Sequence, residues 1–425
     1  MPGHKGTPII GAEPFDITEI DGADVLYSAA GIIKESRDNA ASLFGAGDTF
    51  YSAEGSSLSI RAMLYLSVLY AKEQGKEPLI AAARNAHKSF VSAAALLGID
   101  PIWIYPEGES PIISAPLSAR TLDAFLEDAH GRVTAVYLTS PDYLGNTVDI
   151  ASLASVAKKH GALLLVDNAH GAYLAFLDES RHPMALGADM CADSAHKTLP
   201  ALTGAAYLHI SKSAPKMLSE RAEEALSLFA STSPSYLVLA SLDRVNAYLS
   251  DGYTERLTAF SERLSAMKAR LSAAGYITVG DEPLKLTLAT KAYGYLGSEL
   301  GELLSRQGFV IEFFDRDFAV MMLSPETDDA KLCSLERALL EVPRRAPLTE
   351  APPSSPRPAR RLSLREGMLS PSEEIPISAA LGRTLASVSV SCPPAVPVAV
   401  FGEEIDEDVI AAFKYYGTEK CRVIK

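Results

Sequence analysis

Two segments of the chain carry the residues best suited to chemistry. In the first, the apolar run 162–166 closes on Asp167 and continues as Asn168-Ala169-His170-Gly171. The second reads Asp193-Ser194-Ala195-His196-Lys197-Thr198. A lysine amine can form an imine with an aldehyde, and a carboxylate can keep an aromatic ring nitrogen protonated, so that the ring accepts electrons. Pyridoxal-5′-phosphate (PLP) needs this pair of groups.

Each residue also has an ordinary structural interpretation. A lone lysine is most often a solvated surface charge, and a lone aspartate at a strand end is most often a helix cap. Ser194 and His196, which flank the lysine, add small polar donors of the kind that a phosphate needs. Together and in this order the residues favour a PLP site with Lys197 as the Schiff-base lysine.

The elements expected to position these residues alternate between helix and strand. Helical spacing of apolar residues covers 56–74, 87–97 and 150–160, and a glycine follows each segment. Short apolar strands are predicted at 78–82, 134–138 and 162–166. This alternation predicts an α/β fold with a mostly parallel sheet covered by helices on both faces. Functional groups gather at the carboxyl ends of such strands, where Asp167 falls.

The later part of the chain changes pattern. We predict a PLP-binding large domain with an N-terminal arm over 1–250 and a small α+β domain over 251–345, with strands at 284–288 and 318–322 and a helix at 329–341. A Pro-rich linker at 346–358 and a C-terminal domain at 359–425 follow.

Composition narrows the class of protein. The 425 residues are 48% hydrophobic and 22% charged, which is typical of a globular enzyme. A formal net charge of −14 makes nucleic acid a poor partner. The four cysteines form no Cys-x-x-Cys pair, so free thiols are expected rather than a metal site or disulfide framework. Without a signal peptide or membrane-spanning run, a cytoplasmic location is expected.

Eight stretches distributed along the chain resemble the Orn/Lys/Arg decarboxylase family. They are MPGHKG (1–6), DITE (16–19), GSS (55–57), RNAHKS (84–89), TSPDY (139–143), DNAHG (167–171), ADSAHKTLPALT (192–203) and STSPSY (231–236). The sequence is most similar to the shorter bacterial members, which lack an N-terminal wing domain. This resemblance implies a PLP fold type I (aminotransferase-like) large domain with a mostly parallel sheet, a smaller α+β domain and a C-terminal α+β domain of the decarboxylase type.

The resemblance also implies roles for individual residues. Lys197 is the Schiff-base lysine, and Asp167 pairs with the pyridinium nitrogen. Ala169 contacts one face of the ring and His87 stacks on the other, although a place beside a helix cap is the ordinary interpretation of His87. His170 lies near the ring hydroxyl or the substrate. The phosphate-binding group comprises Gly55, Ser56, Ser57, Ser194 and His196, with Thr232 and Ser233 reaching the cofactor of a partner subunit. For Gly55-Ser56-Ser57, a plain helix start is the alternative.

The implied activity is PLP-dependent decarboxylation of lysine, arginine or ornithine, which yields CO2 and an amine of the polyamine pathway, in a homodimer or larger homo-oligomer with shared active sites. Another PLP reaction (transamination, elimination or retro-aldol cleavage) stays open, as does a catalytically silent PLP-binding homologue.

Two departures from the family pattern concern the ends of the chain. The family's Pro-Pro-Gly-Ile-Pro run reads Pro393-Pro394-Ala395-Val396-Pro397, and an alanine is unfavourable where a glycine adopts positive φ. Glu403 has two interpretations, a contact to substrate or entrance and a solvated member of an acidic run. The chain also begins at the Met-Pro-Gly-His-Lys stretch itself, so the placement of His4 and Lys5 is left open.

Overall fold

The computed structural model describes residues 2–390 and 395–425; Met1 and residues 391–394, which include Cys392, Pro393 and Pro394, lie outside the described residues. The chain forms two compact units, each built from separate stretches. The first comprises Met1–Ala82, Ser118–Ser140 and Asp149–Thr254, and the second Ala83–Leu117, Pro141–Val148 and Glu255–Lys425. Residues 83–117 and 141–148 thus belong to the second unit, although they come early in the chain. The predicted division into domains at 250, 345 and 358 stays a prediction.

The first unit is organised by six neighbouring strands of a seven-stranded sheet, in the order β1-β7-β6-β5-β4-β2. Its strands are β1 (Asp48–Ser52), β2 (Ile80–Ala83), β4 (Ala135–Thr139), β5 (Leu163–Asp167), β6 (Met190–Asp193) and β7 (Ala206–Ile210). The pairs β2–β4, β4–β5 and β5–β6 are parallel, and β7 lies antiparallel to both β6 and β1. The prediction of a mostly parallel α/β sheet is confirmed.

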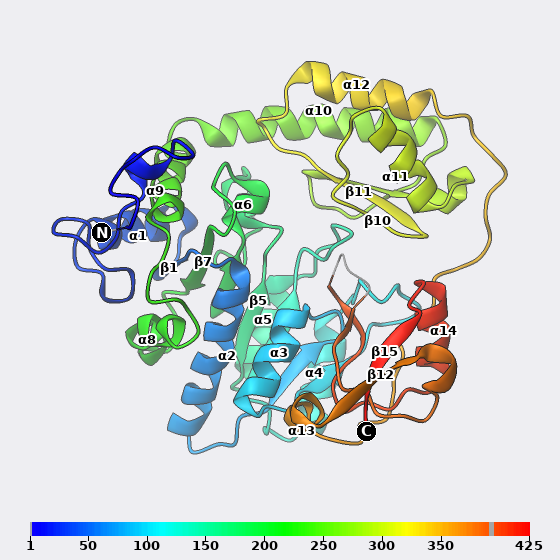
Figure 1. Cartoon of the computed structure of the whole chain (residues 1–425), viewed down its shortest axis with the longest axis horizontal. Helices are drawn as coiled ribbons and strands as arrows, with labels where there is room; N and C mark the ends of the chain where they lie inside the picture. Colours follow the sequence, from blue (N-terminus) through cyan, green and yellow to red (C-terminus); the bar gives the residue numbers. More distant parts are fainter. Residues whose placement is uncertain (1, 391–394) are drawn as a thin grey trace. The chain divides into compact units, whose positions relative to one another are not determined.

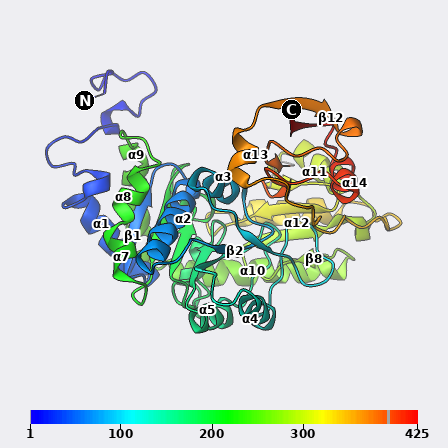
Figure 2. The ribbon, with the colours of Figure 1, turned by 90° about the horizontal axis from the view of Figure 1, so that it is seen from below.

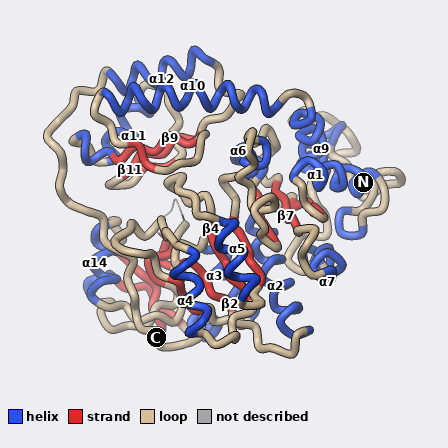
Figure 3. The backbone as a smooth tube through the Cα atoms, turned by 180° about the vertical axis from the view of Figure 1, so that it is seen from behind, coloured by secondary structure: helices blue, strands red, loops and turns tan. Residues whose placement is uncertain are grey.

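Helices cover this sheet because their apolar faces recur at helical spacing and pack on the buried strands. The helical segments of the first unit are η1 (Glu13–Phe15), η2 (Leu26–Ser28), α1 (Ile32–Phe44), α2 (Ser56–Glu73), α4 (Ala119–Asp128), α5 (Ile150–Lys159), η3 (Ala172–Phe176), α6 (Ala195–Thr198), α7 (Lys216–Glu220), α8 (Ala222–Ser227) and α9 (Tyr236–Ser250). Figure 2 shows α7 and α8 near α1 and α2, and Figure 3 shows α4 beside α5. The helices predicted at 56–74 and 150–160 are confirmed.

The second unit contains a smaller antiparallel sheet with the order β10-β11-β9-β8. Its strands are β8 (Thr278–Val279), β9 (Lys285–Ala289), β10 (Phe313–Phe314) and β11 (Phe318–Met322). The helical segments α10 (Tyr253–Ala273), η4 (Thr290–Tyr293), α11 (Gly297–Arg306) and α12 (Asp329–Leu340) accompany it. Figure 1 shows α10 and α12 side by side, where Arg263 pairs with Asp329 and Arg270 with Glu336. The strand predicted at 318–322 is confirmed.

The second unit also contains two earlier elements and the end of the chain. These are β3 (Ile102–Ile104) and α3 (Lys88–Leu97), followed by α13 (Leu364–Leu369), β12 (Ser372–Pro376), η5 (Ile377–Ala379), β13 (Ser389–Val390), β14 (Pro397–Ala399), α14 (Glu407–Tyr415) and β15 (Lys420–Ile424). One buried apolar cluster joins α14 and β15 to the small sheet through side chains such as Phe413, Val423, Phe318 and Val320. The C-terminal segment is therefore packed into this unit.

Cys191, Cys333 and Cys421 are free thiols, as predicted for them. Among the described residues no helix is both long and apolar enough to cross a membrane.

The departure at Ala395 has a visible conformational consequence. Ala395 adopts φ 59°, in the left-handed region where an L-residue with a Cβ is disfavoured. Its carbonyl accepts a hydrogen bond from the backbone N–H of Lys88 at 2.9 Å, and its side chain is buried. The family's glycine thus stands at a position that needs positive φ, and the alanine here carries a backbone cost of about 1 kcal/mol.

We therefore expect Ala395→Gly to leave the free energy of unfolding unchanged or to raise it by up to about 1 kcal/mol, because relief of the positive φ offsets the extra entropy of glycine in the unfolded chain. Ala399→Gly in β14 is the matched control, since Ala399 is fully buried and is not among the positive-φ residues. This control should lose about 1 kcal/mol. Denaturant unfolding measures both, and an equal loss in the two variants would contradict the assignment of strain to Ala395.

Candidate active site

The site begins at the carboxyl end of β5. The strand Leu163–Asp167 is buried along its whole length between the parallel strands β4 and β6, so its apolar run is what a central strand requires. It stops at Asp167, and a tight turn follows in which the N–H of Gly171 donates to the carbonyl of Asn168 at 2.8 Å. This turn presents Asp167, Ala169 and His170 at one edge of the sheet.

Asp167 is a fully enclosed carboxylate with only 2% of its surface exposed. The Tyr137 hydroxyl donates to its Oδ2 at 3.1 Å, and the Ala169 N–H donates to Oδ1 at 3.2 Å. Burial raises the pKa of Asp167, and the nearby charge of Lys197 opposes that rise. Burial, followed by the charge of Asp167, raises the pKa of Tyr137, which keeps the phenol protonated as a donor. Asp167 is thus a carboxylate that a cation would stabilise in its ionised form.

The lysine reaches the same edge from the neighbouring strand. β6 pairs with β5 so that Ala192 stands opposite Asp167, and the chain then passes through Ser194 into the single-turn helix α6. Lys197 on α6 is half-buried, and its Nζ lies 3.1 Å from Nε2 of His170. The structure therefore brings together Asp167, His170 and Lys197, as the sequence predicted for a common site.

A third element, α2, supplies a helix N-terminus to this edge. The hydroxyl of Ser194 donates to the hydroxyl of Ser56 at 2.8 Å, which ties α6 to the first turn of α2. Gly55 precedes the helix with φ 71°, and a Cβ added there would meet no atom within 4 Å. The space beside Gly55 is therefore open. The first turn of this 18-residue helix carries partial positive charge, which suits a phosphate.

The remaining residues predicted to bind phosphate are His196, Thr232 and Ser233. His196 has Nδ1 2.9 Å from the carbonyl of Ala205, so that ring nitrogen donates and Nε2 faces elsewhere. Thr232 and Ser233 are exposed. The backbone N–H of the preceding Ser231 donates to Glu54 at 2.7 Å, next to Gly55.

Residues of the second unit form a separate set. His87 is the N-cap of α3, with its side chain accepting from the Ser89 N–H at 3.1 Å, so the capping position is confirmed and stacking on a ring stays a prediction. Glu403 is 2% exposed and pairs with Arg84 at 3.1 Å, while the Val400 N–H donates to the same oxygen at 2.7 Å. The interpretation of Glu403 as a solvated residue is wrong, because Arg84 compensates its burial. Contact with substrate stays a prediction. In the first unit, His4 accepts a hydrogen bond from the Gly6 N–H, and its Nε2 lies 3.2 Å from Oδ2 of Asp16.

A buried polar cluster around Asp193, next to the Asp167 turn, was not predicted from the sequence. Asp193, at the end of β6, has no exposed surface, and its Oδ2 lies 2.8 Å from Nε2 of His182 and 3.3 Å from Nε2 of His209. Burial alone would raise the pKa of Asp193, but the two histidines lower it below its ordinary value. One sequence signal was present, since Asp193 closes its strand as Asp167 closes the neighbouring one. The histidines gave no such signal.

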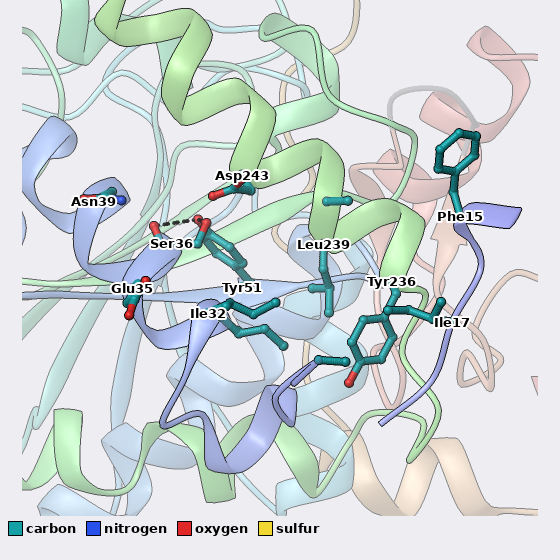
Figure 4. Close-up of a pocket in the computed structure, with 13 residues that line it drawn as sticks. Phe15, Ile17, Ile32, Glu35, Ser36, Asn39, Tyr51, Tyr236, Leu239 and Asp243 are labelled. Atoms are coloured by element: carbon teal, nitrogen blue, oxygen red, sulfur yellow. Dashed lines mark hydrogen bonds between the residues drawn. The ribbon is translucent and has the colours of Figure 1, made fainter. Parts of the chain in front are cut away.

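A cavity of about 400 Å³ lies elsewhere in the first unit. Figure 4 shows its lining from the N-terminal arm, α1 and α9, with Ile32, Leu239 and Tyr236 along one part and the hydrogen-bonded pair Ser36–Tyr51 (2.8 Å) along another. None of the predicted cofactor-binding residues lines it.

Comparison with known proteins identifies the family. The model of the family described as Orn/Lys/Arg decarboxylase, major domain, matches residues 10–274. The chain belongs to this family. It is a PLP-dependent amino-acid decarboxylase, and the family predicted from the sequence is confirmed.

Relatives and solved structures match most of this chain. The chain is 30% identical over 413 residues to the uncharacterized protein YaaO of Bacillus subtilis (strain 168), and the match covers 93% of this chain and 84% of that protein. It is 29% identical over 445 residues to an arginine decarboxylase of Halalkalibacterium halodurans, covering 97% and 88%. Among solved structures, lysine decarboxylase A from Pseudomonas aeruginosa superposes with a TM-score of 0.82 at 19% identity, covering 98% of this chain and 73% of that one. This last similarity concerns the fold.

The residues at the sheet edge fit PLP. Lys197 offers a primary amine for the aldehyde, and Asp167 offers a buried carboxylate whose hydrogen bonds come from two neutral donors, leaving its charge to be balanced by a protonated ring nitrogen. The open space beside Gly55 and the N-terminus of α2 suit the phosphate. Charge and donor type therefore match the cofactor at three points.

The raised pKa of Asp167 predicts opposite effects on stability and activity in Asp167→Asn. In the apoprotein, the folded state holds the proton of the Asp167 carboxyl more tightly than the unfolded state does. Wild-type stability therefore falls as pH rises above 3.8, the ordinary pKa of an aspartate. We expect the variant apoprotein to be more stable than wild type near neutral pH, with the difference vanishing below about pH 4. With PLP saturating, decarboxylation should fall by about 100- to 1000-fold.

Thermal unfolding of the apoproteins across pH and steady-state rates measure the two effects. An Asp167→Asn apoprotein that is less stable than wild type at neutral pH, or one that keeps full activity, would contradict this account of the carboxylate.

Proposed function

We propose that this decarboxylase removes the α-carboxyl group of a basic amino acid, with arginine as the first candidate substrate. The observation that carries the proposal is the extent of its similarity to proteins named arginine decarboxylase. Those of Halalkalibacterium halodurans and Bacillus subtilis are 29% identical and each match 97% of this chain. The match to lysine decarboxylase LdcA of Pseudomonas aeruginosa covers 53% of it. Arginine is therefore favoured over lysine and ornithine.

PLP, when bound, supplies an electron-accepting ring that makes the bonds to the substrate's α-carbon easier to break. The chain's own residues would prepare this chemistry. Asp167 holds a proton on the ring nitrogen, because an ionised carboxylate in a buried site favours a cationic partner. Lys197 would hold the aldehyde carbon and, once displaced by the substrate, could in its protonated form deliver a proton to the α-carbon.

His170 is placed to assist this proton transfer. Its Nε2 lies 3.1 Å from the Lys197 Nζ, within the range for a direct hydrogen bond. His170 is 4% exposed, so bulk water has little access to its ring. Exclusion of water favours loss of a carboxylate, because a less solvated carboxylate is less stabilised in the ground state.

The other predicted residues would fix the cofactor's orientation. The N-terminus of α2 with Gly55, Ser56 and Ser57 would bind the phosphate, with Ser194 and His196 completing its shell. The support for this arrangement is the Ser194–Ser56 hydrogen bond at 2.8 Å.

Three further assignments belong to the proposal. Ala169 and His87 would enclose the ring from its two faces. Thr232 and Ser233, which are exposed, would reach the phosphate of a partner subunit in a homodimer. The amine product would belong to polyamine metabolism in the cytoplasm, since decarboxylation of arginine, lysine or ornithine gives agmatine, cadaverine or putrescine.

A product assay tests the proposal. Purified holoenzyme is incubated separately with arginine, lysine and ornithine, and the amines are detected by mass spectrometry. We expect agmatine to form fastest. Lys197→Ala should lower its rate by about 1000-fold or more, because the amine that binds the cofactor is lost.

Lys212→Ala is the matched control, since Lys212 is an exposed lysine of the same unit. It should retain wild-type activity. Formation of cadaverine or putrescine in place of agmatine would reject arginine as the substrate, and the absence of all three amines from a PLP-loaded enzyme would reject decarboxylation of basic amino acids.

A further inference from the structure

The buried cluster around Asp193 is connected to the Asp167 turn by one side chain. Asn168 lies between Asp167 and Ala169, and its own side chain is directed away from the site, with Nδ2 donating to Oδ1 of Asp193 at 2.7 Å. Its backbone N–H donates to the carbonyl of Ala192 at 3.0 Å. Asn168 has no exposed surface, and its amide oxygen has no hydrogen-bond partner in the described part of the chain. The hydrogen bond from Nδ2 to Asp193 therefore sets the orientation of the amide.

Asp193 is itself held by several donors. The Met184 N–H donates to Nδ1 of His182 at 3.3 Å, which assigns the ring proton to Nε2 and makes Nε2–H the donor to Asp193 at 2.8 Å. The thiol of Cys191 donates to Oδ1 at 3.2 Å. Burial, followed by the charge of Asp193, raises the pKa of Cys191, so the thiol keeps its proton. Asp193 therefore stays anionic although it is fully buried.

The side of the cluster formed by His209 is closely packed and closed to solvent. His209 on β7 has its Nδ1 2.8 Å from the Thr49 hydroxyl on the paired strand β1. The ring of Phe44 packs on His209 with the centroids 4.6 Å apart. His182 and His209 are both fully buried. A carboxylate held by buried and hydrogen-bonded neighbours can in turn hold the group that donates to it in a fixed direction.

We propose that Asp193 and Asn168 are positioning residues for the cofactor site, and that the Asp193–Asn168 hydrogen bond fixes the direction in which Asp167 and Ala169 face the ring. The proposal rests on the proposed roles of Asp167 and Ala169. Because both are chain neighbours of Asn168, an amide locked on the opposite side of the backbone limits the rotation of this turn. A carboxylate displaced by a fraction of an ångström loses much of its effect on a bound charge.

Asp193 also acts through its charge. Its negative charge contributes to the rise in the pKa of Asp167. Two anions at the ends of adjacent strands strengthen the demand for a cation at Asp167, where the cofactor's ring nitrogen is proposed to lie. The charge of Asp193 therefore acts on Asp167 in addition to the Asp193–Asn168 hydrogen bond, and it does so only while Asp193 stays ionised.

The test uses Asn168→Ala, Asp193→Asn and the double variant in the full-length holoenzyme. Three quantities are measured: the PLP dissociation constant, the visible circular dichroism of bound PLP, and the separate kcat and KM. We expect each single variant to weaken PLP binding by about 10- to 100-fold, to alter the dichroism and to lower kcat more than it raises KM. The double variant should be no worse than the poorer single variant, because both remove one interaction.

Asp189→Asn is the matched control. Asp189 precedes the other end of β6, and its carboxylate accepts from the Leu164 N–H at 2.8 Å, so it tests loss of a strand-end aspartate away from the cofactor. It should leave the dichroism and the PLP affinity unchanged. Asn168→Ala retains the His182–Asp193 pair, so it keeps the test decisive if Asp193→Asn does not fold.

Folded variants with wild-type PLP affinity and dichroism would overturn the proposal, as would effects that add in the double variant. These outcomes are distinguishable from failure of the proposed function. If wild type loads PLP at Lys197 and the variants match it, the positioning roles alone are wrong. If wild type never loads PLP, the proposed function fails first.

Discussion

The parallel pairing of β5 with β6 is the constraint on which the site depends. The register that places Asp167 opposite Ala192 brings the chain out of both strands at the same edge of the sheet, so the carboxylate and the Ser194–Lys197 segment meet without any long loop. The first turn of α2 joins them through the Ser56–Ser194 hydrogen bond. One register shift in this ladder would separate the lysine, the carboxylate and the N-terminus of α2.

Two buried aspartates at adjacent strand ends differ in charge preference because their neighbours differ. Two histidines lie against the carboxylate of Asp193 and lower its pKa despite its burial. Asp167 receives a phenol and a backbone N–H, and burial raises its pKa. One carboxylate is thus satisfied within the protein and serves as an anchor, while the other is left in need of a cation, as a group that binds a charged cofactor should be.

Local patterns predicted the elements that carry the site, while contacts between distant segments could not be predicted in this way. The strand ending at Asp167 and the helix after Gly55 follow from a short apolar run and a helical period. His209 reaches Asp193 because β7 returns antiparallel to β6, and His182 reaches it from the loop that precedes β6; no sequence spacing encodes either contact. The sequence left Glu403 open between a contact to substrate or entrance and a solvated residue, and only the folded chain reveals that Arg84 is its partner.

The most direct test of the central claim asks which lysine holds the cofactor. Holoenzyme treated with borohydride, digested and analysed by mass spectrometry should give one PLP-modified peptide, and that peptide should contain Lys197. The account predicts loss of this peptide in Lys197→Ala and no modification at the exposed Lys212. Modification of a different lysine, or unmodified Lys197 in an enzyme that decarboxylates its substrate, would contradict it.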